Sequence, residues 1–196
     1  MRCLAFIFML LWGGQVGASS PSDLRGFGEK APAQLYLFTS LTCPYCAHFH
    51  RDVFPSILEK YVDTGKVQLI IVDVIRGKRD LLTTLAIRCL EGKKADRLEH
   101  FLYDNQEMWG RKDISELKKM ILEHAKQENI KENDIKKCMS DSELQKTIIS
   151  QQENLAALYK ISGFPSLIMR KGLEVHRWEG GNKKEIMTGL KEALQE

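Results

Sequence analysis

Residues 39–50 read TSLTCPYCAHFH and place two cysteines and two histidines within eight positions. A short apolar run at 33–38, with the composition of a buried strand, comes directly before this segment. Apolar residues then recur at four-residue intervals from Phe49 to Tyr61, which predicts a helix. The CxxC segment therefore joins the end of a strand to the start of a helix.

The predicted helix start gives the two cysteines different surroundings. Pro44 suits the first helical turn, and Thr42 is placed to cap it. Unpaired backbone N–H groups and the positive end of the helix dipole would then favour a thiolate at Cys43. Because the thiolate is the form that attacks a disulfide, we expect Cys43 to react and the shielded Cys46 to resolve the mixed disulfide.

The rest of the sequence predicts an α/β fold with a long helical insertion. Pro55 should kink the first helix, and the β-branched run at 67–75 has the pattern of a strand buried on both faces. Residues 78–160 show only helical periodicity. Strand patterns return at 166–170 and 173–178, separated by a turn at Lys171-Gly172, and a last helix follows.

The N-terminus has the pattern of a secretory signal peptide. A basic start is followed by about ten apolar residues at 3–12, too few to span a bilayer. Small residues at Val16 and Ala18 suit cleavage after Ala18, although an uncleaved anchor is the alternative. We expect cleavage, which would leave about 178 of the 196 residues in an exported, soluble protein.

Charge and composition argue against a nucleic-acid partner. The formal charge is +3 for the whole chain, and it falls to +2 when Arg2 leaves with the signal peptide. Basic clusters such as Lys93-Lys94 and Lys118-Lys119 are interleaved with acidic residues, which is typical of solvated helix faces. We therefore expect no nucleic acid as a partner.

The cysteine count allows a second, structural pair. Cys3 leaves with the signal peptide, so four of the five cysteines remain. If Cys43 pairs with Cys46, then Cys89 must pair with Cys138 or both stay free. An oxidising compartment favours a disulfide, and closing a separation of 49 residues would stabilise the fold by roughly 4 kcal/mol. We predict a structural Cys89–Cys138 disulfide.

A second feature of interest lies far from the CxxC segment, where Phe164 and Pro165 precede the returning strand. Only about one X-Pro bond in twenty is cis in folded proteins, so the dipeptide alone is a weak indication. Combined with the CxxC at a strand-to-helix junction, it is more specific. A cis Pro165 would let the backbone of Phe164 pair with an extended substrate segment beside Cys43.

Together these residues resemble the DsbA family of exported thiol:disulfide oxidoreductases, which have a thioredoxin fold interrupted by a helical insertion. The resemblance covers nearly all of the mature chain and rests on Phe38-Thr39-Ser40 before Cys43-Pro44-Tyr45-Cys46, the insertion with Trp109, and Gly163-Phe164-Pro165. It implies that Cys43 is the nucleophile, Cys46 the resolving thiol and Pro165 the cis-proline. The fold division is then a signal peptide at 1–18, a thioredoxin-like domain at 19–77 and 161–196, and the insertion at 78–160.

The resemblance also implies the biological setting. We expect a periplasmic protein that donates its disulfide to reduced or unfolded exported proteins and is reoxidised by a quinone-linked membrane partner. The family is strongly oxidising and uses no cofactor beyond the redox-active disulfide. We further expect a monomer without a bound metal.

Three positions depart from the family's pattern. The dipeptide between the cysteines is Pro44-Tyr45, where the best-known members carry Pro-His, so their oxidising strength does not carry over directly. Leu37 stands six residues before Cys43, where many thioredoxin-fold enzymes have a buried carboxylate. The resolving thiol must therefore lose its proton by another route. Phe164 is bulkier than the residue usual before the cis-proline, which bears on substrate range.

Rival interpretations of the CxxC segment remain open. Cys43, Cys46 and His50 fall on one helical face and suit a structural zinc ion, although no fourth ligand is evident. A non-catalytic module with a structural CPYC disulfide, or an isomerase or reductase of the same fold, is also possible. Isomerases of this type resemble dimers joined by an added N-terminal domain, and only about fifteen residues separate the predicted cleavage site from the first strand. We therefore expect a monomeric oxidase. His48 or His50, if protonated, could stabilise the Cys43 thiolate, but each is just as likely to be a surface helix residue, so we assign neither a role.

Overall fold

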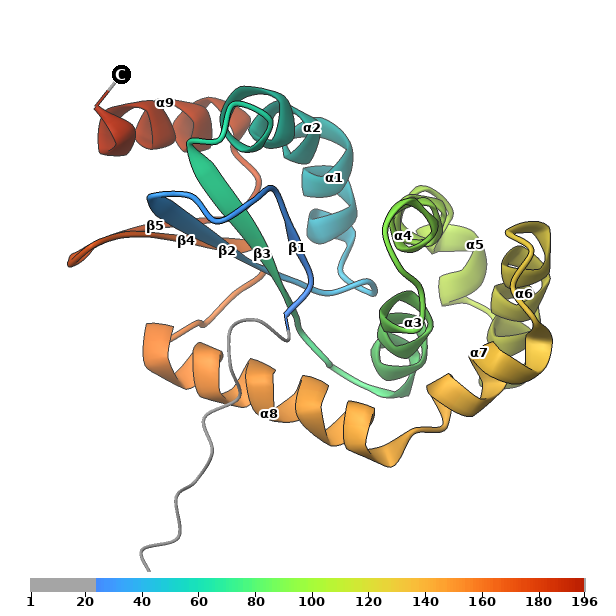
Figure 1. The fold of residues 1–196 in the computed structure, drawn as a ribbon. Coiled ribbons are helices and arrows are strands. Elements are labelled where there is room, and N and C mark those ends of the chain that lie inside the picture. Colours follow the sequence, from blue (N-terminus) through green and yellow to red (C-terminus); the bar gives the residue numbers. More distant parts are fainter. Residues whose placement is uncertain (1–23, 196) are drawn as a thin grey trace, which may run out of the picture.

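The computed structural model describes residues 24–195, which form a mixed five-stranded sheet with helices on both faces (Figure 1). The predicted signal peptide lies outside the described residues. In the strand order β1-β3-β2-β4-β5, the central strands β2 and β3 are parallel and the other neighbours are antiparallel. The strands are β1 (Gly26–Phe27), β2 (Ala33–Thr39), β3 (Val67–Asp73), β4 (Ser166–Lys171) and β5 (Glu174–Glu179).

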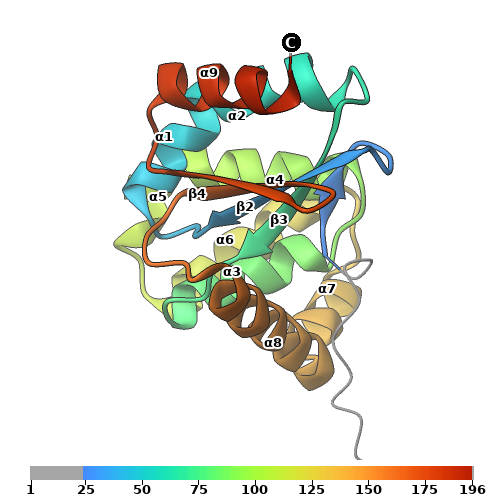
Figure 2. The same cartoon turned by 90° about the vertical axis from the view of Figure 1, so that its left-hand side faces the viewer.

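The sheet is a middle layer, and the two central strands are buried on both sides (Figure 2). Because side chains alternate along a strand, Leu35 and Leu37 of β2 face one layer while Tyr36 and Phe38 face the other. The first layer contains α1 (Pro44–Asp52), α2 (Phe54–Ile57), the π-helix η2 (Leu58–Val62) and α9 (Lys183–Leu194). On the second face, Tyr159 of α8 (Ser142–Tyr159) packs against the rings of Tyr36 and Phe38.

Two details differ from the sequence-based expectation. The segment predicted as one kinked helix is broken between α1 and α2, because Pro55 has no N–H to donate to the preceding turn, and it continues as the π-helix η2. The short strand β1 was not predicted, since two residues carry no periodic pattern. A Cβ at Gly26 would lie 2.9 Å from the carbonyl oxygen of Leu69, so glycine is needed where β1 approaches β3.

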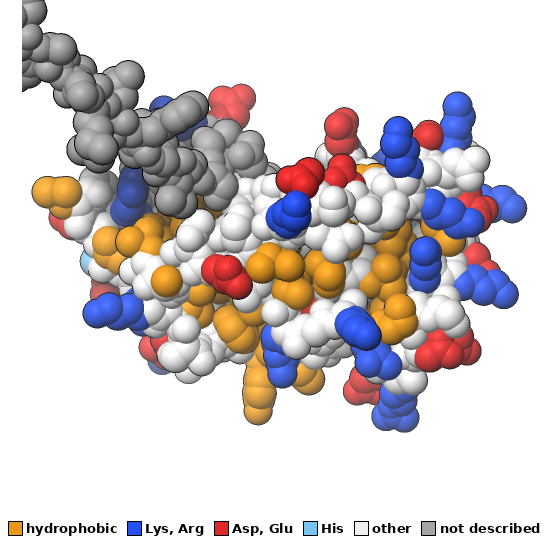
Figure 3. All heavy atoms as spheres, turned by 90° about the horizontal axis from the view of Figure 1, so that it is seen from below, with side chains coloured by type: hydrophobic (Ala, Val, Ile, Leu, Met, Phe, Trp, Pro, Cys, Tyr) orange, Lys and Arg blue, Asp and Glu red, His pale blue; other side chains and the backbone are white. Residues whose placement is uncertain are grey.

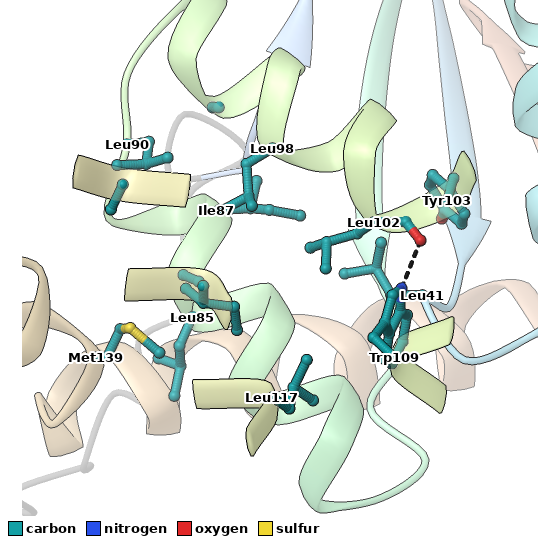
Figure 4. Packing of buried hydrophobic residues seen from close by; sticks show 14 of the residues in the cluster. Leu41, Leu85, Ile87, Leu90, Leu98, Leu102, Tyr103, Trp109, Leu117 and Met139 are labelled. Atoms are coloured by element: carbon teal, nitrogen blue, oxygen red, sulfur yellow. Dashed lines mark hydrogen bonds between the residues drawn. The ribbon is translucent and has the colours of Figure 1, made fainter. Parts of the chain in front are cut away.

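The segment between β3 and β4 forms a helical insertion whose apolar core also includes Leu41 and Cys46 of the CxxC region (Figure 4). Trp109 is fully buried in this core and donates its indole N–H to the carbonyl of Leu102 (2.6 Å). The fold class is therefore confirmed as a thioredoxin-like α/β fold with a helical insertion, whereas the exact division at residues 77 and 160 stays a prediction. Besides α8, the insertion contains α3 (Lys78–Arg88), α4 (Lys93–Asp104), α5 (Gln106–Gly110), α6 (Ile114–Gln127) and α7 (Glu132–Met139).

The surface over α8 mixes apolar and charged side chains (Figure 3). Leu158 is the most exposed large apolar residue of this helix, and Ile149 is partly exposed. Within residues 24–195, none of the helices combines the length and the apolar character that crossing a bilayer requires.

Candidate active site

The CPYC segment lies where β2 leaves the sheet and α1 begins, next to the first helices of the insertion (Figure 1). Cys43 is the N-cap residue of α1, with an extended backbone (φ −89°, ψ 119°), and Pro44 occupies the first turn. The prediction that Thr42 caps this helix is wrong, because the residue directly before Pro44 takes the cap position. The helix start therefore points its unpaired N–H groups toward Cys43 itself.

The two sulfurs of the CxxC pair are both thiols here and differ in accessibility. Cys43 is 6% exposed, whereas Cys46 is completely buried. The Cys43 thiol donates to the carbonyl oxygen of Phe164 (3.8 Å), and the peptide bond between Phe164 and Pro165 is cis. The structure thus brings together the CxxC segment and the distant Phe164-Pro165 dipeptide. An approaching protein can reach only the Cys43 sulfur.

Cys46 is held in an interior that opposes its ionisation. Burial raises the pKa of the Cys46 thiol to about 12. Two hydrogen bonds act in the opposite direction: the backbone N–H of Ser40 donates to the sulfur (3.5 Å), and the Thr39 hydroxyl also favours the thiolate. Position 37, where a carboxylate might have assisted, is a buried leucine. Cys46 therefore stays protonated near neutral pH when the pair is reduced.

Asp80 in the first turn of α3 fixes the loop that precedes Cys43. Its buried carboxylate accepts hydrogen bonds from the Ser40 hydroxyl (2.8 Å), from the N–H (3.0 Å) and hydroxyl (2.8 Å) of Thr42, and from the N–H of Arg76 (3.1 Å). The insertion therefore positions the redox loop as well as covering it. Sequence reasoning missed Asp80, because its partners in the loop precede it by about forty residues.

Gln106 and Tyr45 complete the immediate surroundings of Cys43. The Gln106 amide donates to the carbonyls of Leu41 (2.7 Å) and Cys43 (3.1 Å), so the start of α5 also supports the loop. Tyr45, between the cysteines, is 74% exposed and free to meet a partner protein. A cleft of about 730 Å³ opens beside the loop, lined in part by Thr42, Pro44, Arg76, Gln106 and Arg111.

The two histidines of the segment have opposite environments. His48 is exposed and contacts Asp52 (2.8 Å). His50 is buried, with its ring stacked between Phe54 (4.9 Å) and Tyr103 (4.4 Å), and burial lowers the pKa of His50 to about 3. Of the two possibilities left open for His50, the surface position is wrong, because α4 covers this side of α1. Among residues 24–195, no three His, Cys, Asp or Glu side chains are grouped as a metal-ion site.

A group of buried charges lies between the sheet and α4. Arg25 pairs with Glu99 and lies 3.7 Å from Asp96, while Arg88 lies 3.5 Å from Asp73. Burial raises the pKa of Asp73, since the nearby arginines only partly offset desolvation. These residues come from β3, α3, α4 and the segment before β1. The sequence pattern of any one of these elements therefore could not predict the group.

The second cysteine pair lies within the insertion. Cys89 follows the last residue of α3 and is bonded to Cys138 in α7 (S–S 2.03 Å), across 49 residues of sequence. Both cysteines are only partly buried, and they pack at the margin of the insertion core. The bond therefore ties two helices together away from the CxxC loop.

The fold and the site together define a class: a thioredoxin-like domain with a CxxC dithiol at a helix N-terminus, facing a cis-proline loop and covered by a helical insertion. The profile of the thioredoxin family matches residues 25–178. The chain belongs to this family.

Solved structures similar to this chain have the same architecture. The alpha-DsbA1 of Wolbachia pipientis aligns with a TM-score of 0.74 at 23% identity, over 86% of this chain and 89% of its own. Oxidised BdbD from Bacillus subtilis aligns with the same TM-score of 0.74 at 20% identity, over 90% and 96%. At these identities the similarity shows the fold.

Curated relatives are similar in sequence over most of this chain. A putative protein-disulfide oxidoreductase of Rickettsia bellii is 24% identical over 81% of this chain and 60% of its own length. A probable disulfide bond formation protein D of Bacillus cereus is 26% identical over 82% and 76%. The chain spans about three fifths of the length of the rickettsial relatives.

Proposed function

We propose that this chain is an extracytoplasmic protein-disulfide oxidoreductase that donates a Cys43–Cys46 disulfide to reduced or unfolded proteins. The observation that carries the proposal is the unequal placement of the two sulfurs. Cys43 lies at a helix N-terminus, 3.8 Å from the Phe164 carbonyl, while Cys46 is fully buried behind it. Attack by another protein is thereby directed to one sulfur, as a dithiol oxidant requires.

The exchange takes place in two steps. A substrate thiolate attacks the Cys43 sulfur, the Cys43–Cys46 bond breaks, and Cys46 leaves as a thiolate that takes up a proton. A second substrate thiolate then attacks the substrate sulfur of the mixed disulfide and releases the Cys43 thiolate. The substrate loses two electrons and the CxxC pair gains them. Because the pKa of buried Cys46 is about 12, its protonation opposes return attack on the mixed disulfide.

The loop containing Phe164 and Pro165 would hold the substrate during these steps. The carbonyl of Pro165 already accepts a hydrogen bond from Gly180 (2.8 Å), which anchors the loop to β5. The neighbouring Phe164 backbone, beside Cys43, then presents an edge to which an extended substrate segment can pair. Tyr45 and the Phe164 side chain, both apolar in part, would contact residues flanking the substrate cysteine.

The remaining parts of the proposal concern location and recycling. A signal peptide cleaved after Ala18 would deliver the protein to the periplasm as a monomer. A quinone-linked membrane oxidase would restore the Cys43–Cys46 disulfide, with no further cofactor. The Cys89–Cys138 bond in the insertion supports an oxidising compartment, since such bonds persist there.

The direction of transfer is tested by supplying the oxidised protein separately with a reduced, unfolded substrate and with the same substrate carrying scrambled disulfides. We expect faster oxidation of the reduced form. Faster repair of the scrambled form would overturn the oxidase proposal in favour of an isomerase. The Cys43→Ser variant controls for background oxidation, and activity unchanged in that variant would indicate a non-catalytic module. Zinc retained after dialysis would support the metal-site alternative.

A redox titration of the Cys43/Cys46 pair against glutathione supplies the second criterion. An oxidant has a potential above that of the glutathione pool, and a reductant has one below it. This chain has Tyr45 where the best-known members of the DsbA family have a histidine. Its redox potential therefore does not follow from theirs and has to be measured. A potential near that of thioredoxin would contradict donation of the disulfide.

A further inference from the structure

The resolving thiol needs a way to exchange its proton with a group other than residue 37. When Cys46 attacks a mixed disulfide on Cys43, its sulfur must first lose a proton, and when the disulfide opens it must regain one. The apolar side chain of Leu37 cannot serve, and neither can bulk water, because Cys46 has no exposed surface.

Two helices place polar side chains next to Cys46. On α1, Cys46 and His50 are four residues apart and share one face. On α4, Glu99 and Tyr103 are also four residues apart, and the His50 ring stacks on the Tyr103 ring (4.4 Å). The two faces therefore lie against each other, and all four side chains are buried.

Thr39, the last residue of β2, links the sulfur to this group. Its hydroxyl forms a buried hydrogen bond of 2.7 Å with the phenol of Tyr103. The same hydroxyl hydrogen-bonds to the Cys46 sulfur and favours its thiolate. Thr39 and Tyr103 thus form a continuous chain of exchangeable protons that begins at the reacting atom.

Glu99 is the acidic group near the far end of this chain. One of its carboxylate oxygens pairs with Arg25, while Oε2 is buried without a hydrogen-bond partner, 3.9 Å from the equally unpartnered Nε2 of His50. Burying a carboxylate oxygen without a hydrogen-bond partner costs folding free energy, and such an oxygen can still accept a proton. Burial raises the pKa of the Tyr103 phenol, and the negative charge of Glu99 raises it further.

We infer that Thr39, Tyr103 and Glu99 form the proton route of Cys46, in place of the carboxylate that position 37 lacks. The inference rests on the proposed disulfide exchange. As Cys46 attacks the mixed disulfide, its proton passes to Thr39, that of Thr39 to Tyr103, and that of Tyr103 toward Glu99. The Cys43–Cys46 bond forms and the partner thiolate leaves. Opening of the disulfide reverses each transfer. Thr39 contacts the reacting sulfur, and Tyr103 and Glu99 are positioning residues that act through it.

Other charged groups near this route contribute to the local electrostatic field, but they do not take the place of Thr39, Tyr103 or Glu99. Arg25, Asp73 and Arg88 lie on the sheet side, while Asp96, His100 and Asp104 belong to α4 and Arg51 to α1. His50 faces Glu99 directly, but its pKa of about 3 keeps the ring neutral near neutral pH. Cys43 and Asp80 lie on the loop side of Cys46 and are unchanged in the variants below.

The test measures how fast Cys46 resolves a small mixed disulfide. Reduced protein is mixed with Ellman's reagent, which attaches one thionitrobenzoate to Cys43, and the second thionitrobenzoate is released as Cys46 attacks. Stopped-flow absorbance follows this release from about pH 5 to pH 9 in Tyr103→Phe and Thr39→Val. We expect about tenfold slower release across this range, because the range lies below the pKa of Cys46, where raising that pKa by one unit lowers the thiolate fraction tenfold. Tyr36→Phe, on the opposite face of the sheet, is the matched control.

Glu99→Gln extends the test to the end of the route and should shift the profile in the same direction. If the loss of the Arg25 pair prevents this variant from folding, the two hydroxyl variants decide, because each removes a hydroxyl while retaining the bulk of the side chain. Profiles of Tyr103→Phe and Thr39→Val that coincide with those of the parent and of Tyr36→Phe would overturn the inference. Release of thionitrobenzoate requires no protein substrate. A parent that resolves normally but fails to oxidise proteins would therefore count against the proposed function alone.

Discussion

The two cysteine pairs of this protein have the same chemistry and opposite surroundings. Cys43 and Cys46 are three residues apart at the start of α1, where Cys43 retains a small exposed area and Cys46 is fully buried. Cys89 and Cys138 are 49 residues apart, bonded, and placed between two helices away from that loop. Under the proposed function, the reactivity of Cys43 would follow from its position at a helix N-terminus and from the unequal burial of the pair, whereas the Cys89–Cys138 bond between two helices would contribute stability.

The most direct test of the difference between the two cysteine pairs is removal of the proposed nucleophile, Cys43. Cys43→Ser should reduce oxidation of an unfolded dithiol substrate to the uncatalysed background, because Cys46 is inaccessible to another protein. Supplied with a protein that carries a disulfide, Cys46→Ser should instead accumulate a mixed disulfide at Cys43, because the Cys43 thiolate opens that bond and no second thiol releases the adduct. The adduct is visible on a non-reducing gel. An adduct on Cys46 in the Cys43→Ser variant would contradict the assignment of roles.

Removal of the Cys89–Cys138 disulfide should have the opposite effect, with a loss of stability and little change in the oxidase rate. The double variant Cys89→Ala/Cys138→Ala should lose up to about 4 kcal/mol of unfolding free energy, because the 49-residue separation is no longer closed in the unfolded chain. Its oxidase rate should stay near that of the parent at a temperature where it is folded. Denaturant unfolding and a substrate assay on the same sample check both points. A folded double variant without activity would mean that this bond also shapes the redox loop.

Asp80 tests whether the insertion positions the redox loop. Asp80→Ala should cost about 3 kcal/mol, because the Ser40 and Thr42 donors lose a buried charged acceptor. It should also slow disulfide exchange by loosening the residues before Cys43. Asp113→Ala is the matched control: it removes the exposed N-cap of α6 and should leave exchange unchanged. Equal effects of the two variants on exchange would exclude a positioning role for Asp80.

The sequence predicted what depends on local pattern. The buried strands β2 and β3 are continuous apolar runs, and the strand-to-helix position of the CxxC follows from residues within one segment. The features that were missed depend on contacts between distant segments. Asp80 reaches a loop about forty residues earlier, and His50 is buried because α4 packs over a helix face that looked solvated. Thr42 has cap chemistry, but Asp80 binds its hydroxyl and the helix begins one residue later.

His50 provides the smallest predicted effect, a pH dependence of stability. The pKa of His50 is about 3 in the folded protein, against an ordinary value of 6.5, so the unfolded chain binds a proton between these values that the folded chain does not. His50 therefore contributes stability that is fully present above about pH 6.5 and is lost as the pH falls. Between about pH 6.5 and 5 this loss amounts to at most about 2 kcal/mol.

The His50→Gln variant isolates this contribution, because glutamine does not titrate. Its unfolding free energy should fall less than that of the parent between about pH 6.5 and 5, whereas His48→Gln, at an exposed position, should follow the parent. Asp73, whose pKa is raised by burial, acts in the opposite direction but equally in all three proteins, so it cancels in the comparison. Parallel pH curves for His50→Gln and the parent would mean that His50 gains a proton while folded. In that case Glu99, 3.9 Å from its Nε2, would already be paired with an imidazolium and less available to accept the Cys46 proton.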